Sequence, residues 1–223
     1  MGDEFTENAE ADPPRMLRPG TGHSVLRSQR HADALDGELQ GCGSPIGLLA
    51  VQVARELGAQ VVALIGTRDS RLVIGRKFGA DLTVNSREED AVVAVRGATA
   101  GQGADIVLEC SGAPSAVNDA LHMAKRSGKV VLVGFFDRPV LADLNPAVMN
   151  GISIETVRGE GTGSVARAVS PAGRGRLRAS ELVTHHFALD DVIEAFDTYA
   201  ERRGDAIKVT LDVSEDTEES RVG

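Results

Sequence analysis

Cysteine is scarce in this sequence, and its scarcity limits the chemistry that the chain offers. Two cysteines, Cys42 and Cys110, stand among 223 residues. Two thiolates fall short of a zinc site, and no histidine or cysteine spaced nearby supplies the remaining ligands. We therefore expect no metal centre, and we expect both thiols to pack as small buried side chains rather than to act in redox chemistry.

Long apolar runs and an excess of basic charge are lacking as well. No apolar stretch approaches the roughly 18 residues of a membrane helix, which excludes a membrane-spanning protein. The net charge of -9 and the pI near 5.1 oppose nonspecific attraction to nucleic acid. Residues 1–30 also lack the basic start, apolar middle and cleavage site of a secretory signal. We expect a cytoplasmic protein that binds neither membrane nor nucleic acid.

The two ends of the chain differ in character from the middle. Residues 1–40 contain Pro-Pro and Arg-Pro-Gly and have no sustained periodicity, which predicts a disordered leader. Residues 214–223, "SEDTEESRVG", form an acidic polar tail. The pattern changes abruptly near residue 41, so we expect one domain over 41–213.

Strand-like and helix-like segments alternate within this domain. Apolar, β-branched runs predict buried parallel strands at 60–66, 104–110 and 128–136, and weaker runs predict strands at 81–85, 152–157 and 207–213. Helical spacing of apolar residues marks 45–59, 70–80, 87–99, 115–128 and 189–203; in the last of these Leu189, Val192, Ile193 and Phe196 share a face. The alternation predicts an α/β fold, specifically an open, doubly wound parallel sheet of the Rossmann type with helices on both faces.

A glycine-rich loop, "GCGSPIG" at 41–47, precedes the first predicted helix. Gly41 and Gly43 have the G-x-G spacing of a dinucleotide-binding loop, but Gly47 comes one residue later than G-x-G-x-x-G requires. Either the loop is one residue longer, or Cys42 and Ser44 replace two of its glycines. A glycine-rich entry to a helix with no ligand is the alternative interpretation. The preceding run, "DALDGELQ" at 33–40, is too polar for a central strand, so we expect a degenerate first strand.

The same loop has a second interpretation. It is similar to the glycine loop of S-adenosylmethionine-dependent methyltransferases, although Pro45 stands where that motif has a glycine. Such enzymes usually have an acidic residue at the end of the next strand, where this chain has Gly66 and Thr67. This difference argues against a methyltransferase.

An ordered series of motifs is more specific than the loop. "PIGLLAVQVARELGA", "RKFGAD", "GADIVLECSGAP", "GKVVLVGFF", "VTHHFALDD" and "IKVTLDV" follow one another between residues 45 and 213. This series resembles the cofactor-binding half of the medium-chain zinc-type alcohol dehydrogenases, especially the polyol and threonine dehydrogenase branch. The resemblance implies an NAD(P)-dependent oxidoreductase of alcohols or polyols.

The resemblance also implies positions for the cofactor. The pyrophosphate would lie over the loop of Gly43, Ser44, Pro45, Ile46 and Gly47, the adenosine beside Ser111 and Gly112, and the nicotinamide beside Val133, Gly134, Phe135 and Arg158. Lys208 is similar to a late basic residue near the phosphates in the family. An exposed lysine on an edge strand is the alternative interpretation of Lys208.

The end of the second strand bears on the choice of cofactor. NAD sites place a carboxylate there for the ribose hydroxyls, whereas the 2′-phosphate of NADP requires a basic group and no carboxylate. This chain has Gly66, Thr67, Arg68 and Arg71. The sequence therefore favours NADP over NAD, although both arginines could instead be solvated at a helix start.

The catalytic part of the family is not found in this sequence. Zinc is expected for the family, but its ligands lie in a catalytic domain that nothing in this sequence resembles, and we expect surface or core roles for His185 and His186. No catalytic residue is assigned. We expect a truncated dehydrogenase that is inactive on a small alcohol unless a catalytic domain is supplied; a noncatalytic nucleotide-binding module is the alternative. The resemblance further implies a homodimer formed through the edge strand near 151–157.

Overall fold

The computed structural model describes residues 37–38, 44–157 and 177–213. The predicted disordered leader, apart from two residues, and the predicted acidic tail lie outside the described residues. The first and last of the three described ranges are joined to the middle one by segments, 39–43 and 158–176, that are likewise not described.

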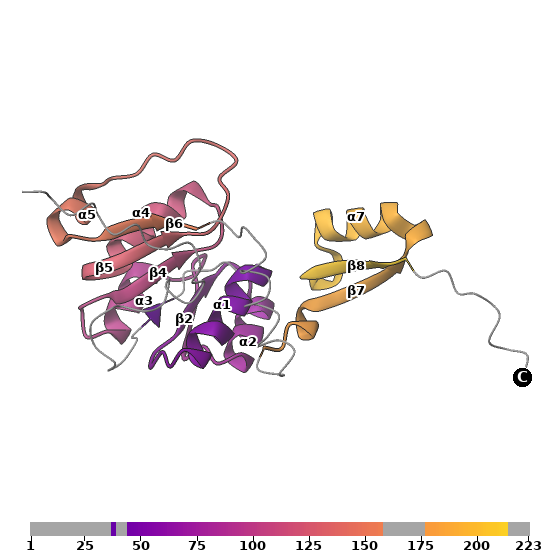
Figure 1. Ribbon diagram of the computed structural model, residues 1–223, viewed down its shortest axis with the longest axis horizontal. Helices are drawn as coiled ribbons and strands as arrows, with labels where there is room; N and C mark the ends of the chain where they lie inside the picture. Colours follow the sequence, from indigo (N-terminus) through magenta and orange to yellow (C-terminus); the bar gives the residue numbers. More distant parts are fainter. Residues whose placement is uncertain (1–36, 39–43, 158–176, 214–223) are drawn as a thin grey trace, which may run out of the picture.

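All of the described strand pairs are parallel (Figure 1). Strands β1 (Gly37–Glu38), β4 (Ala104–Glu109), β5 (Ala124–Leu132) and β6 (Ser153–Thr156) form a sheet in the order β1-β4-β5-β6. Strands β2 (Ala63–Gly66) and β3 (Leu82–Asn85) form a separate pair.

Helices follow the strands in alternation, as the sequence predicts. They are α1 (Pro45–Glu56), α2 (Asp69–Lys77), α3 (Ala91–Ala98), α4 (Pro114–Met123) and α5 (Asn145–Asn150). Polar side chains cap two of them: Ser44 Oγ accepts a hydrogen bond from Gly47 N, and Asp90 Oδ1 accepts one from Val93 N. In the described part of the chain, no helix is both long and apolar enough to cross a membrane.

Two apolar cores show that helices cover both faces of the strands. One core joins Leu48 of α1 and Leu72 of α2 to Leu64 of β2. The other joins α3 and α4 to Ile65, the next residue along β2. Since successive side chains of a strand point to opposite faces, α1 and α2 lie on one side and α3 and α4 on the other. The predicted α/β architecture is confirmed at this level.

A small C-terminal unit, defined as residues 183–213, follows these elements. It consists of β7 (Val183–Ala188), α7 (Val192–Glu201) and β8 (Lys208–Asp212), with β7 and β8 parallel to each other. Short 3-10 turns, η1 (Ser180–Leu182), η2 (Leu189–Asp191) and η3 (Arg203–Asp205), border its strands and helix. Figure 1 shows this unit beside the α1 and α2 side of the larger part.

Two arginines attach the C-terminal unit to the larger part. Arg71 of α2 is buried and donates a hydrogen bond to the carbonyl oxygen of Ala206 at 2.5 Å. Arg178, just before the unit, donates from its backbone N to Gln52 Oε1 at 2.7 Å, and its guanidinium lies 4.6 Å from the centre of the Phe78 ring. These contacts join segments that are more than a hundred residues apart in sequence.

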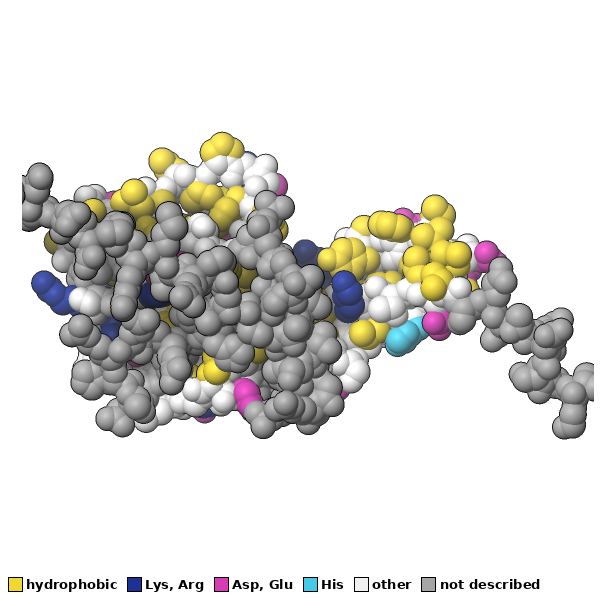
Figure 2. Space-filling view, in the orientation of Figure 1, with side chains coloured by type: hydrophobic (Ala, Val, Ile, Leu, Met, Phe, Trp, Pro, Cys, Tyr) yellow, Lys and Arg dark blue, Asp and Glu magenta, His cyan; other side chains and the backbone are white. Residues whose placement is uncertain are grey.

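The helix predicted over 189–203 has an exposed apolar face. Leu189, Ile193 and Phe196 are more than half exposed, while the smaller Ala195 and Thr198 are buried. Figure 2 shows hydrophobic side chains gathered over α7. Small side chains at the contact let α7 lie close to its strand pair, so the large residues occupy the opposite face.

The structure corrects the bounds of the helix predicted over 115–128, which is shorter than expected. It ends at Met123, and β5 begins at the next residue. Ala124 pairs with Ala104 of β4, and the Lys125 ammonium forms an ion pair with the Asp105 carboxylate. Strand pairing therefore overrides the helical spacing of the last residues of this segment.

Candidate functional site

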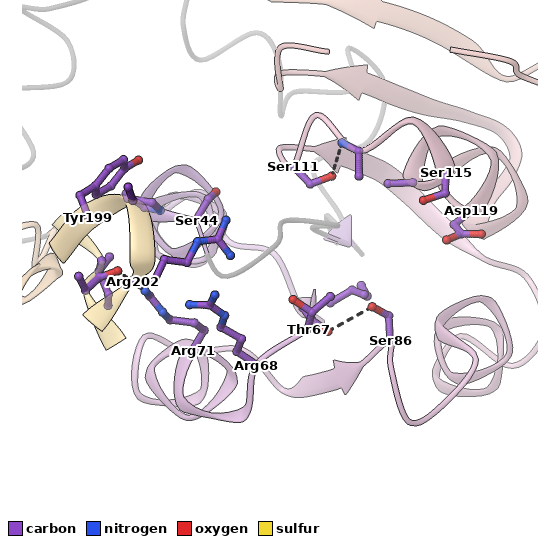
Figure 3. A pocket seen from close by; sticks show the side chains of 18 residues that line it. Ser44, Thr67, Arg68, Arg71, Ser86, Ser111, Ser115, Asp119, Tyr199 and Arg202 are labelled. Atoms are coloured by element: carbon purple, nitrogen blue, oxygen red, sulfur yellow. Dashed lines mark hydrogen bonds between the residues drawn. The ribbon is translucent and has the colours of Figure 1, made fainter. Parts of the chain in front are cut away.

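A cavity of about 510 Å³ opens at the carboxyl ends of three strands. Gly66 at the end of β2, Ser86 just after β3 and Ser111 just after β4 all line it. Residues of the C-terminal unit complete its wall, among them Tyr199 and Arg202 (Figure 3). Open α/β sheets bind ligands in this position, outside the carboxyl ends of their strands.

The start of α1 contributes backbone and hydroxyl groups to the cavity. Ser44 and Pro45 line it, and the Ser44 hydroxyl accepts the hydrogen bond from Gly47 N at 3.2 Å. Leu48 N donates to Ser44 O, and Pro45 has no N–H group. Within the described residues, this leaves the Ile46 N–H as the first amide of the helix without a hydrogen bond, at the positive end of the helix dipole.

Arginines dominate the charge of the cavity. Arg68, Arg71 and Arg202 line it, whereas Asp119 is the acidic residue among its lining. Figure 3 shows Arg68, Arg71 and Arg202 grouped together on the side of the C-terminal unit. The described lining thus carries two positive charges in excess, and guanidinium groups bind phosphates through pairs of N–H donors.

The carboxylate nearest to the end of β2 is directed elsewhere. Asp69, at the start of α2, accepts a hydrogen bond from Asn85 Nδ2 at 3.0 Å and is not among the residues that line the cavity. The same Asn85 amide also donates to Glu88 Oε1 at 3.1 Å. The part of the cavity beside Gly66 and Thr67 therefore presents hydroxyl and guanidinium groups rather than a carboxylate.

A buried carboxylate organises the loops after β4 and β5. Glu109 is 0% exposed, and its carboxylate accepts hydrogen bonds from Ser111 N at 2.7 Å and from Gly112 N at 3.1 Å, as well as from the Ser111 hydroxyl. Its carbonyl oxygen accepts from Val133 N and Gly134 N. Glu109 thus holds both loops in contact with each other.

The two loops pack so closely that their glycines are required. A Cβ atom on Gly134 would lie 2.3 Å from Gly112 N, and one on Gly112 would lie 2.0 Å from Phe135 O. Gly112 also has a φ of +69°, a conformation that favours glycine. The backbone of residues 109–112 therefore lies directly against that of residues 133–135.

The structure brings together some of the residues that the sequence predicts to bind the cofactor. The predicted residues that line the cavity are Ser44, Pro45, Gly66, Thr67, Arg68, Arg71 and Ser111. Ile46 and Gly47 stand beside them in the first turn of α1. Gly112, Val133, Gly134 and Phe135 form a second group at the ends of β4 and β5, outside the lining. Lys208 is exposed at the start of β8 and also lies outside it, whereas Gly43 and Arg158 are outside the described residues.

Several polar residues that line the cavity were not predicted from the sequence. They are Ser86, Ser115, Asp119, Tyr199 and Arg202. Ser115 and Asp119 are four residues apart in a predicted helix that starts after a strand end, so their shared face was available as a signal. Nothing in the local sequence places Arg202 near Arg71, because only the docking of the C-terminal unit brings these residues together.

The pKa of the Asp119 carboxyl in this cavity departs from its ordinary value. Burial raises the pKa of its carboxyl above the ordinary value, and the charge of Asp90 raises it further. His122, on the next turn of α4, lowers the same pKa by a smaller amount. The ionised form of Asp119 is therefore less favoured than in an unfolded chain.

Comparison with known proteins identifies the family. An α/β fold with a cationic cavity at the strand ends is typical of proteins that bind nucleotides. The family described as "Zinc-binding dehydrogenase" matches residues 45–171, more than half of the sequence. The chain belongs to this zinc-binding dehydrogenase family, and its described α/β part is the Rossmann-like, cofactor-binding part of that family.

Relatives with assigned activities are similar over much of the chain. An L-threonine 3-dehydrogenase from Bacillus velezensis is 35% identical over 191 residues, covering 85% of this chain and 54% of that protein. A D-arabitol-phosphate dehydrogenase from Enterococcus avium is 33% identical over 170 residues, covering 75% of this chain and 48% of that protein. The chain thus spans about half the length of these relatives.

Solved structures give the same picture. An alcohol dehydrogenase from Thermotoga maritima has a TM-score of 0.75 and 27% identity, with 84% of this chain and 52% of that chain covered. The alcohol dehydrogenase TADH from Thermus sp. ATN1 has a TM-score of 0.74 and 26% identity, with 81% and 52% covered.

The zinc in the family's description raises the question of a metal site. In the part of the chain that the structure describes, no three histidine, cysteine, aspartate or glutamate residues are grouped so as to hold a metal ion. His185 and His186 are hydrogen bonded instead to the hydroxyls of Thr184 and Thr210. The described residues therefore do not fit a zinc ion.

Proposed function

We propose that this chain is the NADP(H)-binding part of an alcohol or polyol dehydrogenase. The observation that carries this proposal is the pair Arg68 and Arg71 at the end of β2, where the cavity has no carboxylate and where a third guanidinium, Arg202, joins them. Such a group suits a 2′-phosphate, which forms charge-assisted hydrogen bonds with arginine. A carboxylate at the same position would favour the free ribose hydroxyls of NAD instead.

The remaining cofactor positions follow from the same arrangement. The pyrophosphate would lie at the start of α1, beside Ser44 and the Ile46 N–H, with Gly47 in the first turn of the helix. Gly43 stays a prediction for the same group. Ser111 and Gly112 would border the adenosine. The nicotinamide would lie beside Val133, Gly134 and Phe135, which the Glu109 contacts hold next to Gly112. Arg158 and Lys208 stay predictions for the nicotinamide and the phosphates.

The proposal includes a single doubly wound sheet. Its order would be β3-β2-β1-β4-β5-β6, in which the four-stranded sheet and the β2-β3 pair are joined through β1. The two residues of β1 hydrogen bond to β4, and the cores on both faces continue from β2 to β4. This continuity supports one sheet with a degenerate first strand.

The proposed chemistry is hydride transfer between the nicotinamide and a hydroxyl-bearing carbon. The names of the relatives, threonine and arabitol-phosphate dehydrogenases, support a small alcohol or polyol as the substrate. Such a reaction needs the substrate carbon held against the nicotinamide and a group that takes the hydroxyl proton. Because the chain spans about half of the length of these relatives, we propose that the 223-residue chain binds the cofactor without turnover unless a catalytic domain is supplied.

Fluorescence titration tests the proposal. The purified 223-residue chain is titrated with NADPH and with NADH under identical salt, and alcohols are then added to the oxidised cofactors. We expect NADPH to bind at least about tenfold more tightly than NADH, with no turnover. Equal affinities would refute the role of the arginines, and absence of binding by both would refute the dinucleotide site. Competition by S-adenosylmethionine would favour the methyltransferase alternative.

Two further properties belong to the proposal. We propose a homodimer formed through β6, whose residues are all exposed and which pairs on one side only within the described residues. We also propose a cytoplasmic location, where NADP-dependent alcohol chemistry has its cofactor supply.

A further inference from the structure

The two ends of the cavity differ in charge. Figure 3 shows Arg68, Arg71 and Arg202 on one side and Ser115 with Asp119 on the opposite side. Asp119 is the one acidic group among the residues that line the cavity in the described part of the chain. An occupant with anionic groups at one end therefore meets a carboxylate at its other end.

The position of Asp119 is set by α4. This helix starts at Pro114, immediately after the loop that Glu109 organises, so its first turns have a fixed place beside the ends of the strands. Ser115 and Asp119 are four residues apart and both face the cavity, one turn of helix from each other. The carboxyl group lies where a bound nucleotide would extend away from the arginines.

The covalent structure of a nucleotide decides which of its parts reaches this end. In NADP the base and the 2′-phosphate are attached to adjacent ribose carbons, C1′ and C2′, and project from opposite faces of the ring. A nucleotide whose 2′-phosphate contacts the arginines therefore directs its base away from them, across the cavity. A carboxylate accepts hydrogen bonds but donates none. It therefore attracts an amino group on the base and repels a carbonyl oxygen in the same place.

We propose that Asp119 is a specificity-determining residue that accepts a hydrogen bond from the exocyclic amino group of adenine. This inference rests on the proposed function, because it takes the occupant of the cavity to be NADP(H). It adds a second recognised feature, the base, to the 2′-phosphate. The cavity then selects the adenine base at one end and the 2′-phosphate at the other.

The test compares NADPH with its hypoxanthine analogue, in which a carbonyl replaces the amino group. Both reduced compounds are titrated by nicotinamide fluorescence into the wild-type 223-residue chain and into Asp119→Asn. We expect the wild-type chain to bind NADPH about tenfold more tightly than the analogue. The amide of Asp119→Asn both donates and accepts, so we expect its ratio of affinities to be close to one.

A matched control and the contrary outcomes complete the experiment. Asp190→Asn makes the same change at an exposed residue of η2, outside the cavity lining, and should keep the wild-type ratio. Equal binding of both compounds by the wild-type chain, or an unchanged ratio in Asp119→Asn, would overturn the inference while the NADPH site stands. Failure of the wild-type chain to bind NADPH would overturn both proposals. The wild-type ratio needs no variant, so the test does not depend on how a variant folds.

Discussion

The arginines of the cavity differ in how far the protein itself uses their hydrogen-bond donors. Arg71 is buried and donates to the Ala206 carbonyl oxygen, so it supports the docking of the C-terminal unit. Arg68 is half-buried and makes no hydrogen bond within the described residues through its guanidinium. The donors of Arg68 are thus available to a ligand, whereas those of Arg71 are partly engaged by the protein itself.

This difference predicts that Arg68→Ala weakens the binding of NADPH but not the binding of NADH. Hydrogen bonds to a charged group contribute about 1.5–3 kcal/mol, so we expect NADPH to bind about 10- to 100-fold more weakly. NADH, which lacks the 2′-phosphate, should bind as it does to the wild-type chain. Fluorescence titration of both cofactors provides the measurement, and Arg87→Ala, at an exposed residue outside the lining, provides the control. NADPH affinity that is unchanged in Arg68→Ala would exclude this contact.

The carboxyl of Asp119 predicts a dependence of stability on pH. Burial and Asp90 raise its pKa in the folded protein, and His122 lowers it to a smaller extent. At low pH the carboxyl is protonated in both the folded and the unfolded protein, and its contribution to the free energy of unfolding is fully present. Because its pKa is raised in the folded protein, this contribution is lost as the pH rises through the raised value. We expect Asp119→Asn to be more stable than the wild type near neutral pH, by less than about 1 kcal/mol because solvent screens a half-exposed group.

Urea unfolding as a function of pH tests the direction of this stability change. The difference in free energy of unfolding between Asp119→Asn and the wild type should shrink as the pH falls from about 7 toward about 4. The same measurements on Asp190→Asn, at an exposed carboxyl, serve as the baseline. A difference that grows on acidification would contradict the raised pKa.

At the scale of elements, the loops after β4 and β5 form one packed unit. Their backbones are in contact at Gly112 and Gly134, and Glu109 hydrogen bonds to both loops. A methyl group at Gly134 would lie 2.9 Å from Glu109 Oε2 as well as against Gly112 N. The pairing of β4 with β5 fixes the starting points of both loops.

Gly134→Ala should therefore destabilise the protein. Inserting a methyl group into packed structure costs about 1–3 kcal/mol, and here the obstacle is backbone, so we expect the upper part of that range. Gly97→Ala is the matched control, since a Cβ on Gly97 in α3 meets nothing within 4 Å and alanine favours a helix by about 0.5–1 kcal/mol. Urea unfolding of both variants should show opposite signs. A stable Gly134→Ala would indicate that the two loops separate easily.

The elements also show how far local sequence predicts this fold. Apolar runs and helical spacing are local properties of the sequence. They correctly predicted the alternation of strands β2, β3, β4 and β6 with helices α1 to α3. The start of β5 at Ala124 was not, because it depends on pairing with Ala104, a residue on another strand. The exposed face of α7 was not predicted either, because a stripe of large apolar residues does not reveal which face the neighbouring strands contact.

At the scale of the whole molecule, the cavity depends on two parts of the chain. Motifs next to the strands predicted some of the residues that line the cavity. These are Ser44, Pro45, Gly66, Thr67, Arg68, Arg71 and Ser111. Arg202 belongs to the C-terminal unit and reaches the same cavity through contacts such as Arg71 with Ala206, which lie 135 residues apart. Contacts of this kind leave no local pattern, so the residues that the C-terminal unit contributes to the cavity could not be predicted from the sequence.

The other whole-molecule property is the edge of the four-stranded sheet. All residues of β6 are exposed, and the helix that precedes it, α5, carries two large apolar side chains, Val148 and Met149, that are at least three-quarters exposed. An uncovered edge with an apolar border favours pairing with a second copy across a two-fold axis. The proposed homodimer would cover both features at once.

Ile154→Lys tests this dimer. Ile154 lies in β6 and is 42% exposed, so the lysine fits the monomer, but two copies of it would bring like charges together at a two-fold interface. We expect the wild-type chain to sediment at twice 23.4 kDa and the variant at 23.4 kDa. Val93→Lys makes the same change at an apolar residue of α3 that is 67% exposed, and should leave the dimer intact. If Ile154→Lys remains dimeric, the interface does not lie at β6, and dissociation of Val93→Lys would place it on the α3 side instead.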